Sequence, residues 1–223
     1  MGMGDQAADR APAEPGGPAG PGGPAAPART AEPVRRLRRA ERREQIIDAA
    51  TRAFARAGFA ATSLDDVAAE AGITRVILYR HFESKAGMYR AVLDRACTRL
   101  AETVGTGSYG EDAIPALVRA AAGDPDAFRL LFRHAAREPE FRAHADALTT
   151  ASAEVARHDL ERQLPPGPWL DWAARLVPAV AIEAVIAWLD AGQPDPGQAP
   201  GRIGQVIFGA IQAAQPREPE GPA

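Results

Sequence analysis

The longest proline-free window of the chain runs from Val34 to Ile114. Proline disrupts helix interiors, so a window of this length leaves room for several uninterrupted helices. Apolar residues recur through it at spacings of three and four, which is the pattern of amphipathic helices. No part of the chain keeps up the apolar–polar alternation that is typical of half-buried strands. The sequence therefore predicts an all-α fold.

Turn-forming and capping residues separate the predicted helices. Gly58 and Gly72 stand where the first two helices should end, and Ser63, Thr74 and Ser84 stand where the next three should begin. Further along, each gap between apolar segments is rich in proline, glycine or acidic residues. We expect helices at about 38–57, 64–71, 75–82, 84–104, 111–122, 125–136, 139–164, 168–191 and 201–215.

Shifts in composition mark the domain boundaries. The first 33 residues contain 7 Pro, 7 Gly and 9 Ala without hydrophobic periodicity, so we expect a disordered tail at 1–33. Residues 34–86 form a predicted N-terminal domain of three helices, and residues 87–215 form a second helical domain. A short disordered tail is predicted at 216–223.

Charge is distributed unevenly along the chain. Residues 34–90 carry 12 basic and 7 acidic residues (net +5), whereas residues 91–223 carry 12 basic and 18 acidic residues (net −6). A basic N-terminal segment suits a polyanionic partner. There is no apolar run long enough for a membrane span, no apolar leader, and one cysteine, Cys97. We therefore expect a cytoplasmic protein without membrane contact or internal disulfide.

The stretch GITRVILYRHFESK, from Gly72 to Lys85, is both apolar and basic. On a helical wheel Leu78 and Phe82 share one face, which predicts that both are buried. Aliphatic side chains on the opposite, exposed face need a partner that covers them. That opposite face presents Val76, Ile77, Tyr79 and Arg80.

Two helices joined by the tight turn AGIT match a helix-turn-helix, whose second helix enters the major groove of DNA. In that groove, aliphatic side chains contact thymine methyl groups and arginines reach guanine edges or phosphates. Tyrosine, histidine, lysine and a helix N-terminus can all hold phosphate oxygens. The predicted DNA-contacting residues are Ser63, Arg75, Val76, Ile77, Tyr79, Arg80, His81 and Lys85.

The segment TSLDDVAAEAGITRVILYRHFESKAGMYRAVL, preceded by a helix ending in AFARAGF, resembles the DNA-binding domain of the tetracycline-repressor (TetR) family over about residues 42–93. The helix-one glycine, the Thr-Ser cap, the A-x-x-A-G turn, the L-Y-x-x-F core and the Ser-Lys start of the fourth helix occur in order and at family spacing. Many members carry Gly, Ala or Pro where this chain has Val76. The resemblance implies DNA contacts at Ser63, Arg75, Val76, Tyr79, His81 and Lys85.

Two C-terminal segments carry more apolar surface than one protomer of this size should cover. The helix predicted at 201–215 has a continuous apolar stripe, and the helix at 168–191 is apolar almost all round. Pairing with a twofold copy would cover both, and the family resemblance implies a four-helix dimer interface. We expect a homodimer through about 168–191 and 201–215, while ordinary core helices in a monomer stay an alternative.

The middle helices carry aromatic residues with few polar neighbours, which is typical of small-molecule sites. The candidate ligand-binding residues are Phe128, Phe132, His134, Phe141 and Trp172, although core packing explains each of them singly. No histidines, cysteines and acids stand at metal-ligand spacing, and no nucleophile–base set, phosphate loop or dinucleotide motif occurs. The sequence predicts no catalytic residue, metal or cofactor.

These features predict a homodimeric, sequence-specific transcriptional regulator that binds a pseudo-palindromic operator in double-stranded DNA. The expected mode is repression relieved by a small-molecule effector. Two alternatives stay open. One is a DNA-binding protein that has no ligand or is controlled by a partner, which a middle domain without a cavity would favour. The other is a helical enzyme that its N-terminal domain tethers to DNA.

Overall fold

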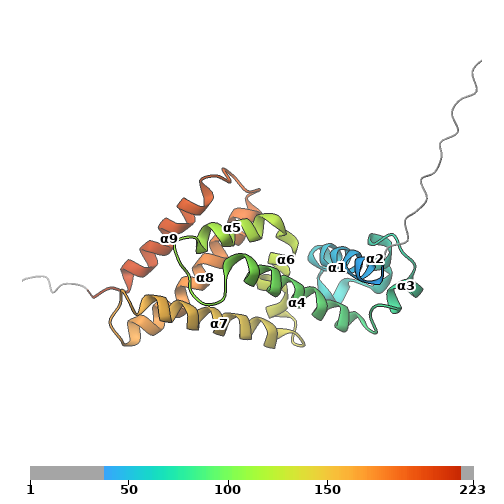
Figure 1. The fold of residues 1–223 in the computed structure, drawn as a ribbon, viewed down its shortest axis with the longest axis horizontal. Coiled ribbons are helices and arrows are strands. Elements are labelled where there is room, and N and C mark those ends of the chain that lie inside the picture. Colours follow the sequence, from blue (N-terminus) through green and yellow to red (C-terminus); the bar gives the residue numbers. More distant parts are fainter. Residues whose placement is uncertain (1–37, 217–223) are drawn as a thin grey trace, which may run out of the picture. The chain divides into compact units, whose positions relative to one another are not determined.

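The computed structural model describes residues 38–216, and these residues form helices and no strand. These described residues belong to one compact unit. The tails predicted at 1–33 and 216–223 lie outside the described residues, apart from Pro216. The predicted all-α fold is confirmed. The α-helices (Figure 1) are α1 (Arg39–Ala61), α2 (Leu64–Glu70), α3 (Arg75–Tyr79), α4 (Lys85–Val104), α5 (Ala113–Gly123), α6 (Pro125–Arg129), α7 (Arg142–Leu160), α8 (Pro168–Asp190) and α9 (Ala199–Ala213).

Besides α3, which ends at Tyr79 and not at the predicted residue 82, two helices differ clearly from their predicted extent. The helix expected at 125–136 begins as α6 but continues through a π-helical turn, Leu130–His134, and a 3₁₀ turn, Ala135–Arg137. α7 is shorter than the predicted 139–164, because Pro139 lies in the turn that precedes it and residues 161–164 leave the helix. Neither difference changes the order of the helices along the chain.

α1 is interrupted at Gly58, the residue at which the sequence predicts its end. Gly58 has φ 79°, a left-handed conformation that side chains with a Cβ rarely adopt. The backbone N–H of Thr62 donates to the Gly58 carbonyl over 3.3 Å, and the Thr62 hydroxyl donates to it over 2.7 Å. The predicted inner face of α1 is buried at Ile46, Ile47, Ala50, Ala53 and Phe54, but Ala57 is exposed next to the break.

α1 to α4 share one hydrophobic core. Val67 of α2, Leu78 of α3 and Val92 of α4 are fully buried against α1 in this core. Residues from the segment that follows α5 complete it, including Leu131 and Phe141. α4 packs on α1 and also on α5 (Figure 1). The domain boundary predicted between residues 86 and 87 therefore falls inside a continuous helix.

α5, α8 and α9 form a second core, which includes Val118, Val185, Ile186 and Ile203. α8 is long and apolar enough to cross a membrane on length and composition alone. In the fold, its inner face is buried against other helices, as expected of a core helix. Its outer face, with that of α9, leaves large apolar side chains exposed, namely Trp169, Trp172, Val206 and Phe208.

Candidate DNA-binding surface and ligand cavity

The turn between α2 and α3 is closed by backbone hydrogen bonds. Gly72 has φ 64°, and the N–H of Ile73 donates to the Ala68 carbonyl over 3.0 Å. On the inner side of α3, Leu78 and Phe82 are buried, as the wheel predicts. This anchoring fixes which side of α3 faces outward.

Polar contacts hold α2 and its turn against α1. The Gln45 amide donates to the Ala71 carbonyl over 2.9 Å. Arg52 and Arg56 both donate to the Glu70 carboxylate, over 2.8 and 3.0 Å, and these bonds lower the pKa of that carboxyl. The orientation of the helix-turn-helix therefore depends on side chains as well as on the apolar core.

The outward face of α3 is aliphatic, aromatic and cationic, as predicted. Val76 is 65% exposed and Tyr79 is 46% exposed. Arg80 is exposed, and its guanidinium has no hydrogen bond or ion pair with any residue in the described part of the chain. Ile77 is half-buried at the edge of this face. An unpaired guanidinium next to an exposed valine is available to a ligand outside the chain.

Arg75, at the start of α3, is held by two partners. One guanidinium nitrogen donates to Asp65 over 2.9 Å, and another donates to the Tyr79 hydroxyl over 3.1 Å. The hydrogen bond to Tyr79, followed by the negative charge of Asp65, raises the pKa of Arg75. The pair is exposed, so it holds Arg75 and Tyr79 next to each other on the outward face.

Ser63 caps α2 as the sequence predicts. Its hydroxyl accepts from the Asp66 N–H over 3.1 Å, and its own N–H donates to the Asp66 carboxylate over 2.8 Å. The hydroxyl and then the N–H of Ser63 lower the pKa of Asp66. The predicted phosphate contact at Ser63 therefore involves groups that are already engaged in the cap.

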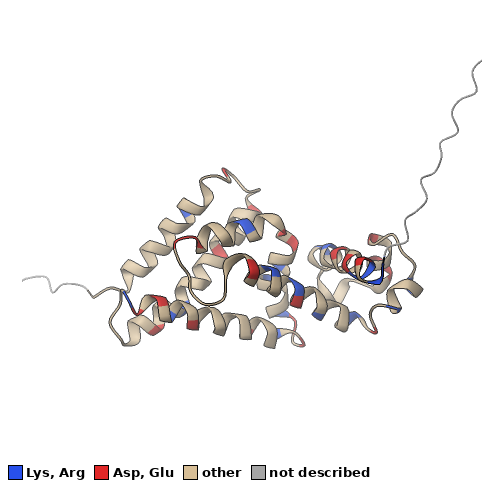
Figure 2. Cartoon of the chain, viewed as in Figure 1, with Lys and Arg blue, Asp and Glu red and all other residues tan. Residues whose placement is uncertain are grey.

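His81 lies near the basic start of α1. Burial lowers its pKa first, and the charges of Arg39, Arg42 and Arg43 lower it further. The lowered pKa favours the uncharged form of the imidazole at neutral pH. The arginines that surround it recur along α1 (Figure 2), and sequence reasoning did not single them out as candidate contacts. The repeated arginines at the start of α1 are the feature of the sequence from which these contacts could have been predicted.

Lys85 is occupied within the chain. Its ammonium group donates to the carbonyls of Phe59, Thr62 and Ala60 over 2.8, 3.1 and 3.3 Å. It also lies 4.5 Å from the centre of the Phe59 ring. A lysine that satisfies the free carbonyls beyond the end of a helix stabilises that end. This geometry favours a structural role for Lys85 over the predicted phosphate contact.

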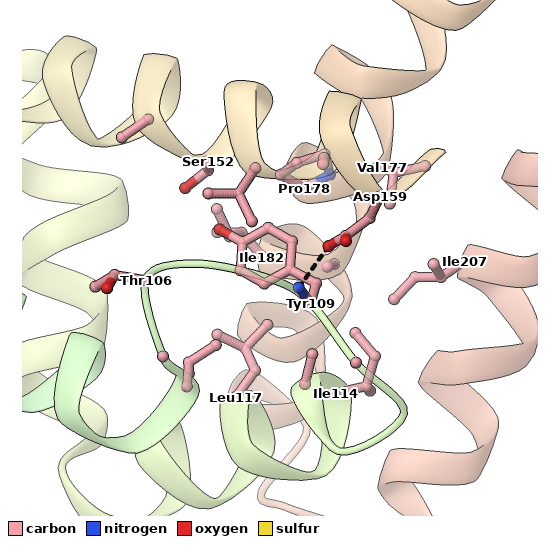
Figure 3. Close-up of a pocket in the computed structure, with 18 of the residues that line it drawn as sticks. Thr106, Tyr109, Ile114, Leu117, Ser152, Asp159, Val177, Pro178, Ile182 and Ile207 are labelled. Atoms are coloured by element: carbon pink, nitrogen blue, oxygen red, sulfur yellow. Dashed lines mark hydrogen bonds between the residues drawn. The ribbon is translucent and has the colours of Figure 1, made fainter. Parts of the chain in front are cut away.

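A cavity of about 390 Å³ opens among α4, α5, α7, α8 and α9 (Figure 3). Its wall is mainly aliphatic, with Leu100, Ile114, Leu117, Val155 and Ile182 among the lining residues. The segment between α4 and α5 closes one side and contributes Thr106 and Tyr109. A cavity of this volume and lining suits a small organic molecule.

Of the five residues predicted to bind a ligand, Phe132 alone lines this cavity. Phe141 packs at the α1–α4 core instead, with ring centres 4.6 Å from Tyr89 and 5.0 Å from Phe59. Trp172 lies on the outer face of α8, against Trp169. Phe128 and His134 also lie outside this cavity wall. The prediction chose aromatic residues, whereas the wall is built mostly from aliphatic residues of α4, α5, α7, α8 and α9.

The charged residues of the cavity wall are acidic. Asp159 of α7 accepts from the Ser108 hydroxyl over 3.0 Å and from the Tyr109 N–H over 2.5 Å. Arg162 donates to the same carboxylate over 2.6 Å from the solvent side. Cys97 also lines the cavity, and burial raises the pKa of its thiol. Across residues 38–216 no group of three or more potential metal ligands comes together.

Comparisons with known proteins agree with this geometry. The family model "Bacterial regulatory proteins, tetR family" matches residues 46–92. The regulator TtgR of Pseudomonas putida is 52% identical over 52 residues, which cover 23% of this chain and 25% of TtgR. The transcriptional activator FasR of Mycolicibacterium smegmatis is 30% identical over 122 residues, 51% of this chain and 56% of FasR. The chain thus spans between a quarter and about half of the length of these relatives.

Solved structures share the fold over most of the described chain. A TetR-like regulator from Rhodococcus aligns with a TM-score of 0.67 and 22% identity, over 79% of this chain and 99% of that one. NalD of Pseudomonas aeruginosa aligns with a TM-score of 0.55 and 22% identity, over 77% and 96% of the two chains. FadR of Bacillus subtilis aligns with a TM-score of 0.58 and 17% identity, over 75% and 97%. The helix-turn-helix region, residues 46–92, is thus similar to the tetR family of bacterial regulatory proteins, and the fold of the described chain is similar to that of solved TetR-like regulators.

Proposed function

We propose that the protein is a transcriptional regulator whose α3 reads base edges in the major groove of duplex DNA. The observation that carries the proposal is the outward face of α3, where exposed Val76 and Tyr79 stand beside an unpaired Arg80. Val76 and Ile77 would contact thymine methyl groups, and Arg80 would bind a guanine edge. Arg75 and Tyr79, held together by their hydrogen bond, would grip phosphate oxygens.

The other residues predicted to contact DNA differ in which of their groups can still bind a phosphate. Burial and the nearby arginines favour the uncharged ring of His81 at neutral pH, so it would add a neutral hydrogen bond to a phosphate. Ser63 would contribute through the N-terminus of α2, which its cap orients. Lys85 would act indirectly, by fixing the end of α1.

The regulator would act as a homodimer. Trp169 and Phe208 are 63% and 61% exposed on α8 and α9, and Val206 is 54% exposed beside Phe208. Apolar side chains of this size on neighbouring helices favour burial against a twofold copy. The two DNA-binding domains would then bind half-sites related by the same twofold axis, so the operator would be pseudo-palindromic. The protein would act in the cytoplasm, where bacterial DNA lies.

The cavity supports control by a small molecule over control without a ligand. NalD is described as a repressor and FasR as an activator, so the similar proteins include regulators that lower transcription and regulators that raise it. FadR of Bacillus subtilis was solved with stearoyl-CoA. We propose repression that an effector relieves. A thousandfold loss of operator affinity on effector binding requires roughly 4 kcal/mol of coupling between the cavity and α3.

The role of α3 is tested by selecting preferred sequences from a random duplex library with the wild type and with Arg80→Ala. Loss of the guanidinium should relax the preference at one position in each half-site, and weaken binding to the selected sequence roughly tenfold or more. Arg119→Ala is the matched control, because Arg119 is an exposed arginine on α5, away from α3. An unaltered selection profile for Arg80→Ala would contradict base recognition by this residue.

A further inference from the structure

Asp159 is the one charged residue among residues 38–216 that is buried, with 8% of the surface of the whole residue exposed. Burying a charge costs free energy unless partners compensate for it. Asp159 also stands one residue before the end of α7, where the negative end of the helix dipole disfavours an anion. A residue held in a position that is unfavourable on both counts calls for a functional explanation.

Asp159 lines the cavity; its Oδ1 accepts from Ser108 and Arg162, and its Oδ2 accepts from the Tyr109 N–H. Ser108 and Tyr109 approach it from the segment between α4 and α5, and Arg162 approaches from the solvent side. The Arg162 side chain is 67% exposed, so water screens its charge. A carboxylate has about four acceptor sites, and these partners take three of them.

The rest of the cavity wall contains no positive charge. None of the lining residues is lysine, arginine or histidine, and the second charged residue of the wall is also acidic, Glu111. The rings of Tyr109 and Phe132 offer aromatic surface to a ligand. In Figure 3, the Tyr109 ring lies next to Asp159 with aliphatic residues around both, including Leu117 and Ile182. An anionic ligand would lose its hydration here without gaining a cationic partner.

We propose that the effector is a lipophilic organic cation whose charged head lies at Asp159 and against the Tyr109 ring. The inference rests on the proposed function, because it names the class of molecule that this cavity accepts. The aliphatic wall buries the apolar body of the ligand, and the carboxylate with the aromatic ring binds the cationic head. The cation would compete with Ser108 and Tyr109 for the carboxylate, in the segment that directly follows α4.

The proposal is tested with three probes that share one body, namely 4-phenylbutyl-trimethylammonium, 4-phenylbutan-1-ol and 4-phenylbutanoate. Calorimetry on the full chain without DNA should show that the cation binds about tenfold more tightly than the alcohol, and the carboxylate more weakly than the alcohol. The alcohol or the carboxylate binding as tightly as the cation would overturn the proposal, as would the absence of binding by all three.

Asp159→Asn tests the residue itself. The variant should lose the preference for the cation over the alcohol, while its affinity for the alcohol stays within about threefold of the wild type. Glu154→Gln removes an exposed acid from the same helix outside the cavity wall, and it should keep the full preference. An unchanged preference in folded Asp159→Asn would overturn the role of Asp159. If that variant does not fold, the ranking of the three probes on the wild type decides.

The same samples separate this inference from the proposed function. Operator binding is measured without any probe, and probe binding is measured without DNA. If the protein binds DNA selectively but the affinities of the three probes do not follow the expected order, the inference about the effector is contradicted and the proposed function stands. A cation preference in a protein that prefers no duplex supports the chemistry of the cavity and contradicts the proposed function.

Discussion

Lys85 and Arg80 are both cations at the end of the helix-turn-helix, but their surroundings differ. The Lys85 ammonium donates to three carbonyls beyond the break in α1, whereas Arg80 is exposed and unpaired within the described residues. At the scale of single residues, this contrast separates groups that hold the domain together from groups that are free to bind DNA.

Lys85→Met should lower the free energy of unfolding by about 1–3 kcal/mol, because the carbonyls at the end of α1 lose a charge-assisted donor. Chemical denaturation checks the value. Arg80→Met removes a charge of the same sign and should leave stability within about 0.5 kcal/mol of the wild type, while DNA affinity falls. If Lys85→Met is as stable as the wild type but no longer binds DNA, the structural role is contradicted and the phosphate contact predicted from the sequence is supported.

At the scale of secondary structure, α2 depends on its N-terminal cap. Ser63→Ala should destabilise the protein by about 1 kcal/mol, because the Asp66 N–H loses its acceptor. Denaturation curves of the variant and the wild type at neutral pH measure this cost. Ser84→Ala, which removes the hydroxyl that caps α4, is a matched substitution at another cap and should behave alike. Equal stability of Ser63→Ala and the wild type would contradict the cap.

The same cap should respond to acid. The pKa of Asp66 is lower in the folded chain than its ordinary value, because Ser63 donates to its carboxylate. Its stabilising contribution is therefore present above the ordinary carboxyl pKa and is lost as pH falls through the lowered folded value. The stability difference between the wild type and Asp66→Asn should shrink on acidification, as denaturation at neutral and acidic pH would reveal. A difference that grows in acid would contradict this assignment.

Local pattern accounts for what the sequence predicted well. The burial of Leu78 and Phe82, the exposure of Val76 and the break at Gly58 depend on residues a few positions apart, so helical periodicity and capping rules reach them. Lys85 escaped prediction because its acceptors lie 23 to 26 residues earlier in the chain. The cavity escaped for a related reason, since its wall exists only after five helices and the segment before α5 have packed together.

For the whole molecule, the exposed apolar faces of α8 and α9 predict association. Val206→Glu places a charge in the middle of the proposed interface and should convert the dimer to a monomer in light-scattering measurements. Ala122→Glu introduces the same charge on the exposed surface of α5 and should leave the dimer intact. A wild type that is monomeric at micromolar concentration would contradict the interface.

The most direct test of DNA recognition by α3 is the ratio of dissociation constants for a random duplex and for the selected operator. Fluorescence anisotropy at physiological salt should give a ratio of about a thousand or more for the wild type, with affinity for both duplexes falling steeply as salt rises. Arg80→Ala should reduce the ratio, because it removes a contact to a base edge. A wild type that binds the two duplexes equally well at low salt would contradict the account.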